Sequence, residues 1–130
     1  HGTQRHVFRC GETVVVQVLA EARTEIDRMM VGILVRNRLG MEVFGTNSRV
    51  EGLELGPFLS GERFAVEFRF PCYLTRQDYT VTVATQNWDG TSQDWIDDAA
   101  TISVVDAREL AGVAALPVEL SWRRVSVSGR

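Results

Sequence analysis

The chain has 130 residues, the size of one domain, and 45% of them are apolar, so it can bury a core without disulfides or metal ions. Its net charge of −3, with acidic and basic residues well mixed, argues against a nucleic-acid ligand. All fourteen basic residues are Arg, and no apolar run is long enough to cross a bilayer.

Apolar and polar side chains alternate along most of the chain. The alternation is found at residues 12–22, 29–36, 62–70, 78–86 and 100–106. It is clearest in the third stretch, where Phe64, Val66 and Phe68 share one face. Turn residues, among them Gly11 and Gly61, separate the stretches. Short alternating strands bounded by turns predict an all-β fold, an immunoglobulin-like antiparallel β-sandwich.

Residues 31–48, VGILVRNRLGMEVFGTNS, predict a hairpin that turns at Leu39-Gly40. The hairpin ends in a polar cluster after Gly45. We interpret Gly45 as a backbone bend, and Thr46, Asn47 and Ser48 as side chains that satisfy loose backbone groups. A second interpretation is that this cluster contacts a sugar.

Tyr79 stands at the start of a late strand, five residues after Leu74. A Tyr in this place fits the tyrosine corner of immunoglobulin-like sandwiches, in which the hydroxyl bonds to backbone a few residues upstream. The alternative is an ordinary inward-facing aromatic residue. Cys10 and Cys72 have two readings as well, a disulfide or two buried thiols.

The C-terminal segment alternates again after Pro117. Val118, Leu120 and Trp122 share one face, and residues 118–127 therefore predict a late, additional strand. This strand either pairs within the chain or is exchanged with a second copy to form a dimer. In both cases residues 1–130 form a single domain.

The sequence offers little for catalysis. The two His residues, His1 and His6, stand at the start of the chain, which argues against His-based catalysis and zinc binding in its body. With no Lys, the chain has no phosphate-binding P-loop. The remaining candidates are the carboxylates of Asp89, Asp94, Asp97 and Asp98. We rank them as solvated turn formers first, Ca²⁺ ligands second and a glycosidase pair third, and we expect no enzyme activity, cofactor or metal.

The segment WDGTSQDWIDD is the best candidate for a binding site. Trp88 and Trp95 flank a polar loop, and aromatic rings beside amides and carboxylates suit a sugar. One of the two Trp residues is expected to plug the core, and Trp95 is the better candidate for that role. The predicted carbohydrate site consists of Trp88, Asp89, Gln86, Arg36, Arg69 and Trp95. In this set Arg36 and Gln86 join the site if their strands share a sheet.

Three motifs in order resemble one family. They are the hairpin of residues 31–48, a Gly-Glu turn before a Phe-rich strand (residues 59–70), and a Leu-then-Tyr pair that opens a strand (residues 73–85). The set resembles the C-terminal domain of Wzt-type proteins, the ATP-binding subunits of ABC transporters that export O-antigen polysaccharide. One departure is Asp78, at a position where the family usually has Gly.

The resemblance implies a non-catalytic, immunoglobulin-like domain that binds the undecaprenyl-linked glycan, often through a terminal modification. It also implies an ATPase domain N-terminal to this one, a permease partner, a homodimer, and a cytoplasmic location at the inner face of the inner membrane. Two other functions stay open: a dimerisation platform of the ATPase without glycan binding, and an accessory module of a glycan-modifying enzyme.

Overall fold

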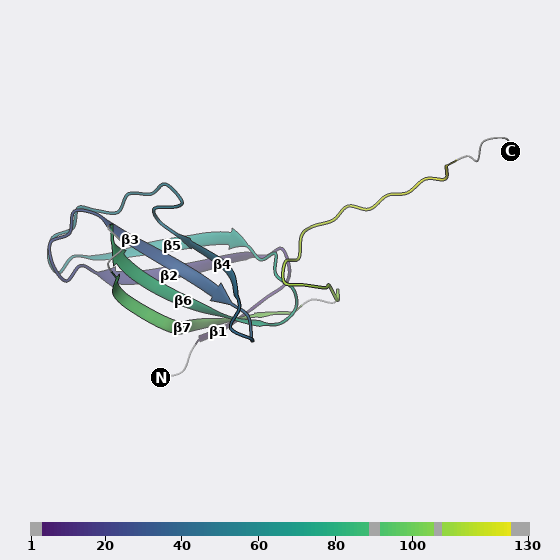
Figure 1. Cartoon of the computed structure of the whole chain (residues 1–130), viewed down its shortest axis with the longest axis horizontal. Coiled ribbons are helices and arrows are strands. Elements are labelled where there is room, and N and C mark those ends of the chain that lie inside the picture. Colours follow the sequence, from purple (N-terminus) through teal and green to yellow (C-terminus); the bar gives the residue numbers. More distant parts are fainter. Residues whose placement is uncertain (1–3, 89–91, 106–107, 126–130) are drawn as a thin grey trace.

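The computed structural model describes residues 4–88, 92–105 and 108–125, with backbone only for residues 4–5 and 92–98. Within these ranges the chain forms strands and no helix. The strands are β1 (Gln4–Phe8), β2 (Thr13–Glu21), β3 (Met29–Arg36), β4 (Glu42–Asn47), β5 (Arg63–Pro71), β6 (Asp78–Asn87) and β7 (Ser92–Val104). They form a sheet in the order β1-β7-β6-β3-β4 and a smaller sheet, β2-β5 (Figure 1).

The strand pairing confirms the predicted sandwich. β3 is antiparallel to β4 and β6, β6 is antiparallel to β7, and β2 is antiparallel to β5. The exception is β1, which runs parallel to β7. Sequence alone missed β1, because QRHVF has no two-residue alternation. The predicted hairpin is also present as β3, β4 and a turn in which Gly40 has a φ of +82°.

The core lies between the two sheets and is built by the predicted alternation. Val66 and Phe68 of β5 are buried, whereas Glu67 between them is exposed. Val31, Ile33 and Val35 of β3 face them across the core. The other strands contribute Val14 and Val18 (β2), Tyr79 and Val81 (β6), and Ile102 and Val104 (β7). Burial of these side chains is the main force that holds the sheets together.

Tyr79 confirms the tyrosine-corner interpretation. The side chain is fully buried, and its hydroxyl donates a hydrogen bond to the carbonyl oxygen of Thr75 over 2.7 Å. Burial raises the pKa of the Tyr79 hydroxyl. The Thr75 hydroxyl in turn donates to the carbonyl oxygen of Gly112 over 2.8 Å. This chain of bonds ties the segment after β7 to the sandwich.

The two cysteines are free thiols. Cys72 is fully buried, and burial raises the pKa of its thiol. Cys10 is half-buried, with its sulfur 3.6 Å from the carbonyl oxygen of Ala115. The structure therefore agrees with the interpretation as two thiols and not with a disulfide.

Two segments differ from the sequence prediction. β7 begins at Ser92, so Asp94, Asp97 and Asp98 belong to a strand and not to a loop. The predicted strand at residues 118–127 is absent from the described part of that segment, which ends at Val125. A strand needs hydrogen bonds to a neighbouring strand, and this segment has none in the described chain.

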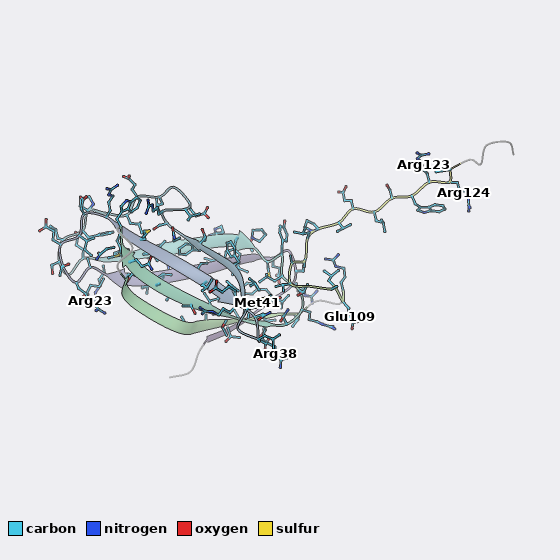
Figure 2. The ribbon with its side chains drawn as sticks, viewed as in Figure 1. Arg23, Arg38, Met41, Glu109, Arg123 and Arg124 are labelled. Atoms are coloured by element: carbon cyan, nitrogen blue, oxygen red, sulfur yellow. The ribbon has the colours of Figure 1, made fainter. Side chains whose placement is uncertain are left out.

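The C-terminal segment instead runs away from the sandwich (Figure 1). Val118, Leu120 and Trp122 are 71%, 93% and 80% exposed. Figure 2 shows Arg123 and Arg124 at its far end, distant from the strands. Among the described residues, no helix is long and apolar enough to span a membrane.

Candidate functional site

The outer face of the larger sheet is hollowed where β3, β4 and β6 lie side by side. The hollow has a volume of about 230 Å³, and we call it the outer groove. Gly32 of β3 is paired with Asn47 of β4 and with Ala84 of β6. With two neighbouring positions that carry no side chain or a single methyl, the layer of side chains that normally covers a sheet is missing here.

Gly45 adds to the outer groove from β4. It pairs with Leu34 and lies within the strand, so the predicted backbone bend at Gly45 is wrong. A Cβ atom at this position would stand 2.9 Å from Cδ1 of Leu34. Glycine at position 45 therefore gives room to the Leu34 side chain, which forms one wall of the outer groove.

Amide side chains border the outer groove. Oδ1 of Asn47 accepts a hydrogen bond from the Val50 amide over 2.8 Å, and Oγ of Ser48 accepts one from the buried Val31 amide over 3.1 Å. These bonds confirm that Asn47 and Ser48 satisfy backbone groups. Thr46 differs from the prediction, because its hydroxyl donates to a carboxylate oxygen of Glu51. The side-chain nitrogen of Asn47 and the side-chain amide of Gln86 make no hydrogen bond to any described residue. Both groups are therefore available to a ligand.

Arg36 and Gln86 share a sheet, as the predicted site requires, because β3 pairs with β6. Nη1 of Arg36 donates to Oγ1 of Thr82 over 3.0 Å, and Nη2 lies 3.9 Å from a carboxylate oxygen of Glu42. Thr82 lines the outer groove, so Arg36 stands at one end of it and Gln86 nearer the other.

Trp88 follows β6 directly and is half-buried. Its ring is not bare: the guanidinium carbon of Arg28 lies 4.7 Å from the ring centre, and that of Arg49 lies 4.9 Å from it. Arg28 immediately precedes β3, and Arg49 follows β4. Such cation–π contacts hold the three side chains together. We call Arg28, Arg49 and Trp88 the arginine–tryptophan cluster.

Of the remaining predicted site residues, the structure places Arg69 away from the outer groove. Arg69 lies on β5, in the other sheet, where its Nη2 is 3.4 Å from a carboxylate oxygen of Glu67. Asp89 lies outside the described residues. The backbone of Trp95 pairs with Ala84 in the sheet, but its side chain is outside the described parts, so its predicted role as a plug stays a prediction.

Sequence reasoning missed Arg28 and Arg49. The two residues are far apart in the chain and approach Trp88 only because β3 lies between β4 and β6. No local sequence pattern links them to Trp88; in the structure, Met29 pairs with Asn87, which brings Arg28 next to Trp88. Within the described residues, no three His, Cys, Asp or Glu side chains gather as metal ligands would.

A search of curated proteins gave no match. The solved structures that match this chain include the following two. The crystal structure of the C-terminal domain of Wzt has a TM-score of 0.83 and 21% identity, and the match covers 90% of this chain and 74% of that one. The structure of chicken MD-1 complexed with lipid IVa has a TM-score of 0.44 and 17% identity, and the match covers 68% of this chain and 69% of that one.

The first match agrees with the sandwich described above. The family model for the Wzt C-terminal domain matches residues 1–116, which include all seven described strands. The chain therefore belongs to the Wzt C-terminal domain family, a non-catalytic domain of O-antigen ABC transporters.

Proposed function

We propose that this domain binds the O-antigen polysaccharide and that the glycan lies in the outer groove. The observation that carries the proposal is the hollow itself, open at a sheet face that would otherwise be covered by side chains. Its volume of about 230 Å³ suits one or two sugar residues at the end of a chain better than a long buried segment.

The lining of the outer groove has the chemistry that a sugar needs. Gly32 and Ala84 leave a flat floor, on which the C–H face of a pyranose ring can lie. The Gln86 amide and the Asn47 amide nitrogen border this floor and can exchange hydrogen bonds with hydroxyl groups. A ligand site typically combines apolar walls with a few directed polar groups, as here.

Binding of this kind would serve selection and not chemistry. Weak contacts hold the end of an undecaprenyl-linked glycan near the transporter and raise its local concentration at the entrance of the channel. This function requires the ATPase domain and the permease as partners, and a cytoplasmic position at the inner face of the inner membrane.

A second candidate function is a dimerisation platform. It is favoured by the C-terminal segment, where Val118, Leu120 and Trp122 expose apolar side chains on a chain that has no sheet partner among the described residues. Such a segment can add a strand to the sheet of a second copy and produce a homodimer. Membership of a transporter family leaves little support for the third alternative, an accessory module of a glycan-modifying enzyme.

The test fills the outer groove. In Ala84→Phe an aromatic ring would occupy the floor, whereas in the matched control Ala65→Phe the ring would project from the exposed face of β5. We expect polysaccharide from the parent strain to bind Ala84→Phe at least tenfold more weakly in calorimetric titration, and to bind Ala65→Phe normally. Unchanged binding to Ala84→Phe, in a protein with a wild-type melting curve, would place the site elsewhere.

A further inference from the structure

We propose that the arginine–tryptophan cluster is a receptor for an oxyanion carried by the glycan, a carboxylate or a phosphate group. This inference rests on the proposed function, since the cluster would act together with the outer groove. Arg28, Arg49 and Trp88 come from three separate segments and converge on one ring, with guanidinium-to-ring distances of 4.7 and 4.9 Å.

The ring fixes the two guanidinium groups without using their hydrogen bonds. A guanidinium that lies over an indole is held by the π-electrons, while its N–H groups point outward in its own plane. Planar N–H pairs fit the two oxygens of a carboxylate or phosphate. Arg28 and Arg49 therefore present donors that are already positioned, and an anion would lose less side-chain entropy on binding them.

The charges of the cluster are poorly neutralised by the protein. Arg49 makes no ion pair with any residue in the described ranges. The ion pairs of Arg28 with described residues are long contacts of 3.9 Å, to Asp27 and Glu54, whose side chains are 90% and 74% exposed. Such exposed pairs are weak. Two cations near one ring repel each other, and a bound anion would reduce that repulsion.

Arginines elsewhere in the domain have closer acidic partners than Arg28 and Arg49 have. Arg63 lies 3.1 Å from a carboxylate oxygen of Glu21, and Arg76 lies 3.1 Å from one of Glu109. These two arginines have close partners of their own, and neither lies over an aromatic ring in the described structure.

The cluster adjoins the outer groove. Gln86 of the groove is two residues before Trp88, and Asn47 of the groove is two residues before Arg49. Val50, the neighbour of Arg49, lines the groove itself. A sugar ring on the groove floor can thus place an acidic substituent at the cluster. The geometry points to a glycan end that is anionic, with the charge read by Arg28 and Arg49.

The experiment is a titration of the ¹⁵N-labelled chain followed by NMR. The test ligands are methyl glucuronide and glucose 6-phosphate as the two anionic arms, methyl glucoside as the neutral sugar, and inorganic phosphate as the anion without a sugar. We expect both anionic sugars, or one of them, to bind at least tenfold more tightly than methyl glucoside. The indole N–H signal of Trp88 and the side-chain amide signals of Asn47 and Gln86 should shift.

The variants decide the assignment. Arg28→Gln combined with Arg49→Gln should remove the preference for the anionic sugar and leave the weak binding of methyl glucoside unchanged. Arg63→Gln, which removes an arginine from the other sheet, should retain the preference. Added NaCl should weaken only the anionic ligands. Backbone amide spectra that match the wild type will show that each variant is folded.

The outcomes separate this inference from the proposed function. If the anionic sugars bind no more tightly than methyl glucoside, or if the double variant still prefers them, the receptor is refuted. The outer groove is then still tested by glycan binding to Ala84→Phe. If the anionic ligands and phosphate shift Trp88 but leave Asn47 and Gln86 unmoved, the receptor stands and the groove proposal fails. Tighter binding of methyl glucuronide would identify the group as a carboxylate, and tighter binding of glucose 6-phosphate would identify it as a phosphate.

Discussion

β5 and the C-terminal segment have the same alternation of apolar and polar residues, but the apolar side chains are buried in β5 and exposed in the C-terminal segment. In β5, Val66 and Phe68 are 7% and 8% exposed, whereas Leu120 and Trp122 of the C-terminal segment are 93% and 80% exposed. β5 has β2 as a partner and a second sheet to cover its apolar face, and the C-terminal segment has neither in the described chain. Alternation thus predicts which face a strand would bury, and a partner decides whether the strand forms.

The largest effect that tests this comparison is on stability. Phe68→Ala removes a buried ring from between the sheets and should lower the free energy of unfolding by about 3–5 kcal/mol. Leu120→Ala removes a side chain that contacts almost nothing and should change it by less than about 0.5 kcal/mol in a monomer. Urea denaturation of both variants measures the difference. Equal losses would mean that the C-terminal segment packs on the sandwich in solution.

A smaller loss is expected at the tyrosine corner. Tyr79→Phe removes the bond to the carbonyl of Thr75 and leaves that buried group without its partner, at a cost of about 1–3 kcal/mol. A variant at the exposed Tyr73, Tyr73→Phe, is the control and should be neutral. A neutral Tyr79→Phe would show that the corner is filled by packing alone.

The same residue predicts a pH dependence. Because burial raises the pKa of Tyr79 in the folded protein, the unfolded chain loses this proton first as the pH rises. The associated stability is therefore fully present below the unfolded pKa of about 10 and is lost as the pH climbs through the folded pKa. Melting curves of wild type and Tyr79→Phe should accordingly converge above about pH 10. A gap that widens with pH would contradict this sign.

Much of the fold could be predicted from local pattern. The alternation identified the buried faces of β3 and β5, and the position of Tyr79 indicated its hydrogen bond, because both depend on near neighbours in sequence. β1 and the early start of β7 were missed. Both lie at the margin of the larger sheet, where a strand is defined by pairing with its neighbour more than by burial of its own side chains.

The candidate site was predictable only in part. Gln86, Arg36 and Trp88 could be named because their residue types suit a sugar. The floor of the outer groove depends on which residues face each other across strands, as Gly32 does with Ala84. Arg69 was placed with the wrong sheet for a related reason, since sequence does not show which strands pair.

A further prediction, smaller in free energy than those for stability, concerns glycan binding. Trp88→Ala should weaken glycan binding roughly 5- to 30-fold, the equivalent of about 1–2 kcal/mol, because the ring that positions Arg28 and Arg49 is lost. The ring is half-buried, so some stability should be lost too, but less than for Phe68→Ala. One melting curve and one binding isotherm measure the two effects. A destabilised Trp88→Ala whose folded fraction binds normally would remove Trp88 from the site.

Removal of the C-terminal segment should change stability least. It also tests most directly whether this segment, unlike β5, lacks a partner strand. Deleting residues 117–130 takes away no described strand and no described residue of the buried core, so the free energy of unfolding should stay within about 0.5 kcal/mol of that of the intact chain. If this segment pairs with the sheet of a second copy, the intact chain should be a dimer and the deleted chain a monomer in analytical ultracentrifugation. The paired double variant Leu120→Asp and Trp122→Asp should act like the deletion, because charged residues on the apolar face prevent strand addition. A dimer that persists after deletion, or an intact chain that stays monomeric at high concentration, would show that the segment lacks the partner its alternation requires.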